Sequence, residues 1–534
     1  MANNPKDPKV NPEAGGTPAP EASAAQNSLL SIAGNISTFT RLGVPAGLET
    51  TNYAAVYPKT SGYVDLGAGD TRTPCIMRLK WVPTVGVAHD ATADINVAFK
   101  AFYSKVRHAN SGARNYESPD LVAYTMAMDS IANLYHAGLR AYGMLNLYSS
   151  NNAVYPKRIV EAMGFDFEDW INNQPNICFY LKNKMNQLMT FSVPNAMPIF
   201  MSHLDISSKV YTDGEGDKTQ AYVFVQDVYY SYEKADQAAG LTPVSFFTPN
   251  DEKLYTWAQY VQLFERLLQP LLNSEDIAMI SGDIEKCYGT VSAMRIVPIS
   301  DAYNTPVVKD DDILLGINNA LIVPIDASTL ITRDTQGGFF KCEPESKPYA
   351  TNDLSAFYDS GCGPQIGANA FLNFGDVANT PDKVSAALRF HPWVEGPVAK
   401  IEPSDAGWTT TDTIEACGTE IITGIRIYDG YYDAGLSTTI PTALDLQSST
   451  LWIGSGIQLT DSTTRAFQYC SALSKFDWHM PLFFVQADSG SKAYMTVSET
   501  GFLPFCDWQN VAAVPPETMR MIYAAIIYGS FFTF

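Results

Sequence analysis

The sequence predicts an α+β protein with a mainly helical first half and a β-rich second half. Apolar residues recur at steps of three and four between residues 118 and 148, which is the spacing of one helix face. From about residue 296, such periods give way to short apolar runs separated by Thr, Ser, Asp, Gly and Pro. Hydrophobic residues make up 46% and charged residues 17%, against about 25% in a typical protein. So little charge favours a protein whose surface is covered by other protein, which indicates an assembly.

One long helix is predicted from Ser118 to Tyr148. Ser118 can accept a hydrogen bond from free backbone N–H groups, Pro119 suits the first turn, and Asp120 faces the positive end of the helix dipole. At about 1.5 Å per residue this helix would run roughly 45 Å and would need a large surrounding layer. The apolar face that predicts it comprises Leu121, Tyr124, Met128, Ile131, Tyr135, Leu139, Tyr142 and Leu145.

The same helix carries one narrow polar stripe. Asp129, Asn133, His136 and Arg140 fall at i, i+4, i+7 and i+11 among residues that are mostly Ala, Met, Val and Leu. A helix with this pattern is buried nearly all round. We expect His136 to serve there in an ion pair or a cap.

The residues before the long helix divide into three parts. Residues 1–27 hold five prolines among Ala, Gly, Asn and Glu, which predicts a disordered arm. Residues 28–85 predict an extended, surface-tracking segment or short strands, and residues 90–106 a helix. The arm carries Lys6 and Lys9 against Asp7, Glu13 and Glu21, so it is near neutral.

After the long helix, further helices are predicted over 156–164, 166–172, 176–190, 254–268 and 275–288. The fourth is expected to end before Pro270, and the last to be capped by Ser274 and ended by Gly289. One strand, Ala221 to Tyr232, interrupts them because it is rich in Val, Phe and Tyr.

The second half predicts short strands, including the apolar runs 313–315, 320–325, 421–428 and 482–485. A last helix over 518–528 and an apolar tail to Phe534 are expected to dock on the helical half or on a neighbouring subunit. The predicted organisation is therefore a disordered arm (1–27), a helical domain (28–294), an inserted β-rich domain (295–505) and a C-terminal segment (506–534) that returns to the helical part.

Composition disfavours several classes of function. A net charge of −21 without Lys or Arg clusters argues against an ordinary nucleic-acid binder. The eight cysteines lie too far apart for a CxxC zinc site or a compact disulfide framework, which favours free thiols. Neither a signal peptide nor a run of about 20 apolar residues is present, so we expect a protein made in the cytosol.

The motif search finds no cofactor or metal site. The six histidines lack the HxH and HExxH spacings, and GxxxxGK[ST] and GxSxG are absent. Two Asp-Ser-Gly sequences begin at Asp359 and Asp488, and a pair of such carboxylates can share a proton in an aspartic peptidase. Asp-Ser-Gly is also ordinary turn chemistry, and the residues that follow the two copies differ. The aspartic peptidase is the alternative of a different class.

Several segments together resemble the capsid proteins of picobirnaviruses. They are the run from Ser118 to Ser130 with its continuation at 140–143, Tyr155-Pro156 with the stretch 161–169, the turn at 211–213, the strand at 222–225, and the stretches 273–276 and 280–284. They cover about residues 115–290, and their common order makes the resemblance specific.

The resemblance implies a structural protein, not an enzyme, with a helical shell domain and the inserted β-rich domain projecting from it. It implies two-fold dimers on a small icosahedral (T=1) lattice around segmented double-stranded RNA. The virion would be assembled in the host cytoplasm, and the particle could also enclose a viral polymerase. Some relatives carry a strongly basic arm, whereas this arm is near neutral, so weak and non-specific contact with RNA is expected. The alternative within the same class is a coat protein of another double-stranded RNA virus or phage.

Overall fold

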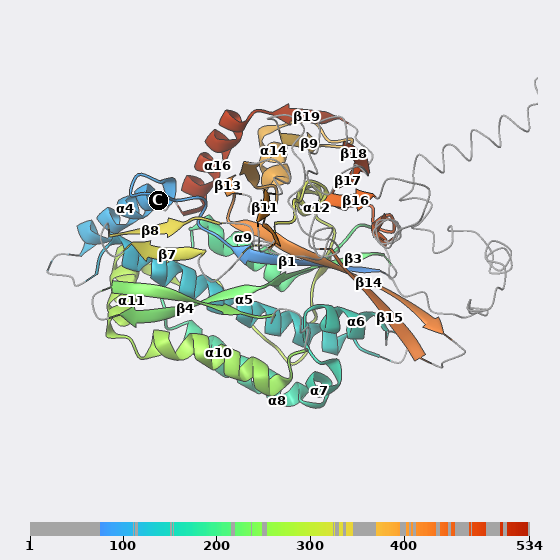
Figure 1. Ribbon diagram of the computed structural model, residues 1–534. Helices are drawn as coiled ribbons and strands as arrows, with labels where there is room; N and C mark the ends of the chain where they lie inside the picture. Colours follow the sequence, from blue (N-terminus) through green and yellow to red (C-terminus); the bar gives the residue numbers. More distant parts are fainter. Residues whose placement is uncertain are drawn as a thin grey trace, which may run out of the picture.

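The computed structural model describes residues 75–531 (Figure 1). Within that range the description omits residues 111, 113–115, 150–151, 153, 215–218, 236–237, 248–253, 324, 326–329, 335–337, 345–369, 396–401, 405–406, 410–412, 434–437, 447–449, 454–468, 471, 487–501 and 506–509. The predicted N-terminal arm and the last three residues of the apolar tail therefore lie outside the described residues.

The long helix α5 spans Ser118–Asn146, and every residue from Pro119 to Leu145 is buried. Its surroundings explain this burial, because helices α4 (Asp94–Ala109), α6 (Val154–Ala162), α8 (Gln174–Leu188) and α9 (Pro198–Ser208) and the strands β4 (Val228–Ala235) and β5 (Ala238–Ser245) all pack against it. The expected cap is displaced by one residue. Glu117 is the N-cap, and its backbone N–H donates to Asp120 Oδ2 at 2.6 Å.

A six-stranded sheet lies beside α5, in the order β15-β14-β1-β3-β2-β6 (Figure 1). Its strands are β1 (Ile76–Pro83), β2 (Val210–Thr212), β3 (Ala221–Gln226), β6 (Val307–Val308), β14 (Glu420–Asp433) and β15 (Thr438–Leu446). β1 pairs in parallel with β3 and antiparallel with β14. The predicted helical and β-rich domains thus both contribute strands to one sheet, and their division at residue 295 stays a prediction.

Of the two alternatives predicted for residues 28–85, the described part forms a strand and not a surface-tracking segment, and this strand, β1, is central in the sheet. Met77, Leu79 and Trp81 belong to the core on one face of the sheet, together with helix α12 (Asp311–Asn318). Ile76 and Val82 point to the other face and join the core around α5. This alternation with a period of two is normal for a strand covered on both faces. The irregular sequence around it gave no sign of a central position.

The predicted strand 221–232 is two strands in different sheets. The chain leaves the large sheet after β3 and enters a hairpin of β4 and β5. Asp227 forms the joint, because its N–H donates to the carbonyl of Trp81 at 2.8 Å and its carbonyl accepts from Phe246 N at 2.6 Å. The sequence could not reveal this break, because β-forming residues continue on both sides of it from residue 221 to residue 232.

Helix α10 (Trp257–Leu272) runs through Pro270, where the sequence predicted its end. A proline leaves the carbonyl four residues earlier without its usual donor. That carbonyl belongs to Arg266, and it accepts the hydroxyl of Ser231 at 3.5 Å. Helix α11 (Glu275–Tyr288) follows as predicted, with Ser274 Oγ accepting from Ile277 N at 3.3 Å. The short helix α7 (Phe167–Asn172) is also present.

The described residues of the second half include two helices that were not predicted, α12 and α14 (Pro381–Leu388). The apolar run 313–315 was predicted as a strand, but Asp310 accepts from the N–H groups of Asp312 and Ile313 at 3.0 and 3.3 Å and caps a helix there. The remaining strands are short, namely β7 (Ile331–Asp334), β8 (Phe339–Cys342), β9 (Ala370–Asn373), β10 (Trp393–Glu395), β11 (Glu402–Ser404), β12 (Gly407–Thr409), β13 (Thr413–Ala416), β16 (Thr450–Ile453), β17 (Leu482–Gln486), β18 (Phe502–Phe505) and β19 (Val511–Val514).

The C-terminal helix α16 (Pro516–Phe531) returns to the helical part of the chain, where it packs against α4 and α9 (Figure 1). The ring of Phe531 is fully buried and lies 5.5 Å from that of Phe99 on α4. Ile527 packs over Gly86, whose φ of +74° and lack of a side chain permit this close approach.

Candidate functional site

The residues of the peptidase alternative, Asp359 and Asp488, both lie outside the described residues. Within the described part of the chain, no group of three or more His, Cys, Asp or Glu side chains is placed to hold a metal ion. Among those same residues, no helix combines the length and the apolar character needed to cross a membrane. The polar chemistry that the structure does bring together is centred on α5.

The polar stripe of α5 is buried, and each member has a different environment. Arg140 donates to the carbonyls of Ile206, Lys209 and Phe224 at 3.0, 3.1 and 2.7 Å, so it ties α5 to the end of α9 and to β3. The three carbonyl acceptors take the place of a carboxylate, so the Arg140 guanidinium is buried with most of its hydrogen bonds satisfied.

His136 is not in an ion pair or a cap, which corrects the expectation from the sequence. Its Nε2 accepts a hydrogen bond from the backbone N–H of Val297 at 3.3 Å. Because the ring is fully buried, its pKa is lowered to about 3 and it is neutral. It therefore satisfies a backbone donor without carrying charge.

Asp129 and Asn133 face α9 on successive turns. Asp129 Oδ2 lies 2.7 Å from His203 Nδ1, and the hydroxyl of Ser207 donates to Asn133 Oδ1 at 3.2 Å. Asn133 also donates to Asp129 Oδ2 at 3.1 Å. The matched i, i+4 spacing on the two helices brings both pairs into register.

Beyond His203, the network continues to the second half of the chain. His203 Nε2 lies 3.6 Å from Oε1 of Glu420, the first residue of β14, and Arg389 Nη2 donates to the same oxygen at 2.7 Å. Ser202 Oγ and Thr419 Oγ1 donate to the two Glu420 oxygens at 2.9 and 2.6 Å. We call Asp129, His203, Glu420 and Arg389 the ion network. It joins α5, α9, β14 and the residue that follows α14.

The charges of the ion network balance when His203 is protonated. Burial alone would raise the pKa of Glu420, but Arg389 and His203 outweigh it and hold that pKa at about 2. Burial alone would likewise lower the pKa of His203, but Asp129 and Glu420 outweigh it and raise that pKa. Asp129 and His203 hold one proton between them, and it lies on the imidazole because a second carboxylate, Glu420, also faces the ring.

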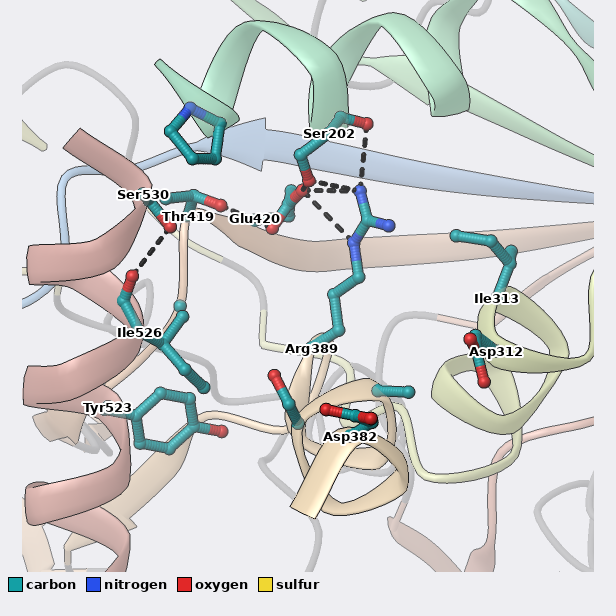
Figure 2. A pocket seen from close by; sticks show the side chains of 14 residues that line it. Ser202, Asp312, Ile313, Asp382, Arg389, Thr419, Glu420, Tyr523, Ile526 and Ser530 are labelled. Carbon is teal, nitrogen blue, oxygen red and sulfur yellow. Dashed lines mark hydrogen bonds and ion pairs between the residues drawn. The ribbon is translucent and has the colours of Figure 1, made fainter. Parts of the chain in front are cut away.

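A pocket of about 320 Å³ opens above the ion network (Figure 2). Arg389 and Glu420 form its polar floor, and Tyr523 and Ile526 of α16 form an apolar wall. Asp312 and Asp382 stand at α12 and α14 on the opposite side, so carboxylates outnumber the single guanidinium. Since Glu420 and Ser202 already engage that guanidinium, the described residues that line the pocket do not offer the free cation that an anionic ligand requires.

Sequence reasoning singled out Asp129 but missed His203, Glu420 and Arg389. Glu420 lies 218 residues from its partner Ser202 in the sequence, and a single sequence carries no signal for that contact. One local signal was present. His203 and Ser207 repeat the four-residue spacing of Asp129 and Asn133, but α9 itself was not predicted.

The surface of the chain offers apolar side chains that a monomer would leave in water. Phe179 on α8 and Met521 on α16 expose 76% and 73% of their surfaces. On α16, only Met519, Tyr523, Ile527 and Phe531 are buried, although its only charged residues are Glu517 and Arg520. A helix that is apolar on every side is normally buried on every side. The outer side of α16 is therefore a candidate contact surface, which we call the outer face of α16 and define by Met521, Ala525 and Tyr528.

Comparison with known proteins gives consistent results. The family model for the picobirnavirus capsid protein matches residues 48–423. The capsid protein precursor of Human picobirnavirus is 29% identical over 485 residues, which cover 88% of this chain and 83% of the relative. The crystal structure of the picobirnavirus capsid superposes with a TM-score of 0.72 at 19% identity, over 92% of this chain and 98% of that chain.

These findings define a structural viral coat protein with an α+β fold, not an enzyme. Because the family model matches more than half of its length, the chain belongs to the picobirnavirus capsid protein family. This confirms the resemblance found in the sequence, and it leaves no support for the alternative coat protein of another double-stranded RNA virus or phage or for the aspartic peptidase.

Proposed function

We propose that this capsid protein assembles as homodimers into a small icosahedral T=1 shell that encloses double-stranded RNA segments. The observation that carries the proposal is the family match over residues 48–423. A coat protein acts by association with copies of itself, and the low content of charged residues agrees with a chain that is largely covered by its neighbours.

The decisive experiment is electron microscopy of the purified full-length recombinant protein. We expect closed particles of one size, and we expect dimers when the particles are dissociated gently. If only small discrete subunits were seen at every salt concentration and pH tried, the proposal of a shell would be refuted. Particles that dissociate to monomers or trimers would instead contradict the dimer alone.

We propose that the outer face of α16 contributes to the contacts between copies. The helix already has an intramolecular role, because Ile527 and Phe531 are buried in the core. Deleting residues 516–534 would therefore damage the protomer as well as the shell, and a point substitution on the outer face separates the two effects. Burying a side chain such as Met521 contributes about 1.5–3 kcal/mol per contact.

Met521→Glu should accordingly prevent particle formation while the protomer keeps its far-ultraviolet circular dichroism spectrum and melting temperature. Met521→Leu is the matched control, because it retains the apolar volume and should assemble. Normal particles from Met521→Glu would place the interface elsewhere, for example at Phe179.

The acidic chain suggests how RNA is packaged. With a net charge of −21, the attraction between the protein and RNA phosphates is weak. Confinement and counterions, rather than phosphate contacts, would therefore hold the duplex. A polymerase enclosed with the RNA would be retained by confinement. Empty shells should therefore form readily in the host cytoplasm and in vitro. Strict dependence of assembly on RNA, or submicromolar affinity for duplex RNA near physiological salt, would contradict this part of the proposal.

A further inference from the structure

The buried imidazole of His203 is surrounded by acceptors on both sides. Its Nδ1 lies 2.7 Å from a carboxylate oxygen of Asp129, and its Nε2 lies 3.6 Å from a carboxylate oxygen of Glu420. An ionised carboxylate can only accept, whereas a neutral imidazole has one donor and one acceptor. Only the imidazolium presents an N–H to both carboxylates, as a hydrogen bond to Asp129 and as an ion-pair contact with Glu420, so the geometry favours the protonated ring.

The charged groups that face this ring come from three elements. Asp129 approaches from α5, Glu420 from β14, and Arg389 from the end of α14, where it is held by Glu420. Trp81 of β1 packs its ring 4.8 Å from the imidazole and contributes no charge. On the pocket side, the other titratable groups of the lining are Tyr523 of α16, Asp312 of α12 and Asp382 of α14. The hydroxyl of Tyr523 donates to the carbonyl of Leu388 at 3.0 Å, and burial raises its pKa, so it stays neutral.

We propose that the ion network is a proton-dependent latch, in which protonated His203 fastens the start of β14 and the end of α14 to α5 and α9. When the proton is lost, two carboxylates and one guanidinium remain around a neutral ring in a largely buried site, where charges are poorly screened. The latch is closed in mildly acidic solution and loosens as the pH rises. Because Glu420 and Arg389 form the floor of the pocket beside α16, opening the latch would displace this floor and expose the buried residues just before β14 (Figure 2).

The direction of the pH effect follows from linkage. The pKa of His203 is raised above its ordinary value of 6.5. Its stabilising effect is therefore complete below about pH 6.5 and is lost as the pH rises through the pKa of the folded state. In that window, one bound proton makes the equilibrium for opening about tenfold more favourable with each pH unit.

Cys417 supplies a local probe of opening, because its thiol is buried and it lies three residues before Glu420. The rate at which a thiol reagent labels Cys417 would be measured by peptide mass spectrometry on the full-length protein between pH 6 and 9. The same rate would be measured for His203→Gln. The ionisation of the thiol itself cancels in the ratio of variant to wild type at each pH.

We expect this ratio to be large at pH 6 and to fall by up to tenfold per pH unit above about pH 6.5. His391→Gln is the matched control. His391 is also buried, but its Nδ1 lies 2.7 Å from the carbonyl of Asn319 and burial lowers its pKa to about 4. Its substitution should therefore give a ratio that does not vary with pH. A pH-independent ratio for His203→Gln would overturn the proposal.

If His203→Gln does not fold, Asp129→Asn replaces it, because loss of this carboxylate removes the main attraction that retains the proton. The ratio for Asp129→Asn should again fall as the pH rises. If neither variant folds, the wild type decides alone. Labelling of Cys417 must then increase with pH more steeply than labelling of Cys287, which belongs to α11, a helix that contributes no residue to the ion network. Equal slopes would overturn the latch.

Discussion

Replacement of Arg389 by Met should reveal how much the ion network contributes to stability. Arg389 donates to Glu420 Oε1 from Nη2 and Nε at 2.7 and 3.2 Å, and the Glu420 side chain is only 2% exposed. Removing one partner of a buried pair leaves an uncompensated charge and typically costs about 3–5 kcal/mol. The free energy of unfolding of Arg389→Met should fall by this amount at pH 7, as measured by urea denaturation of the dissociated protein.

The size of the penalty can be bounded from the carboxyl group itself. If Glu420 became neutral in Arg389→Met, its protonation at pH 7 from an ordinary pKa of 4.5 would cost about 3.4 kcal/mol, at about 1.36 kcal/mol per pH unit. Adding Glu420→Gln should therefore restore up to about 3.4 kcal/mol at pH 7 and little at pH 4.5. A double variant no more stable than Arg389→Met at pH 7 would refute the reasoning, because the loss would then not arise from the stranded charge.

Three other substitutions or deletions have distinct expected outcomes. Gly143→Ala on α5 should lower the free energy of unfolding by about 1–3 kcal/mol, because a Cβ there would lie 2.6 Å from the backbone nitrogen of Thr305. Its control is Gly282→Ala on α11, because no atom lies within 4 Å of a Cβ built there, and that change should stabilise the protein by up to about 1 kcal/mol. If the two substitutions changed the free energy of unfolding equally, the packing argument would be contradicted. Phe531→Ala should cost about 3–5 kcal/mol and lower the melting temperature of the protomer, and an unchanged melting temperature would show that α16 does not rest on α4. Deletion of residues 2–27 should leave particles intact in electron micrographs, and their loss would give the arm a role in assembly.

Local chemistry accounts for the parts of the fold that the sequence predicted. The long apolar period, Pro119 in the first turn and the contact of Asp120 with Glu117 determine α5, and Ser274 and Gly289 determine the two ends of α11. These signals act between residues that are close in the chain. The error at Pro270 has a non-local cause, because the hydroxyl of Ser231, from a different element, satisfied the carbonyl that a proline leaves unpaired.

The position of β1 and the composition of the ion network could not be predicted, because both depend on contacts across the whole chain. β1 is central only because β3 and β14, from distant parts of the sequence, pair with its two edges. Similarly, Glu420 looks like an ordinary charged residue at the start of a strand until the fold places Ser202, His203 and Arg389 around it. Periodicity predicted that Asp129 is buried, but periodicity does not identify a partner.

The position of α16 connects the network to the surface proposed for assembly. The hydroxyl of Tyr523, on the inner side of α16, donates to the carbonyl of Leu388, and the next residue is Arg389 of the ion network. Met521, two residues earlier in the same helix, lies on the outer face. A rigid helix transmits a displacement of one side to the other, so opening of the latch at high pH should alter how the outer face is presented to a neighbouring copy. Particles of the wild type should therefore dissociate more readily as the pH rises above about 6.5, the ordinary pKa of His203, whereas particles of His203→Gln should lose this dependence.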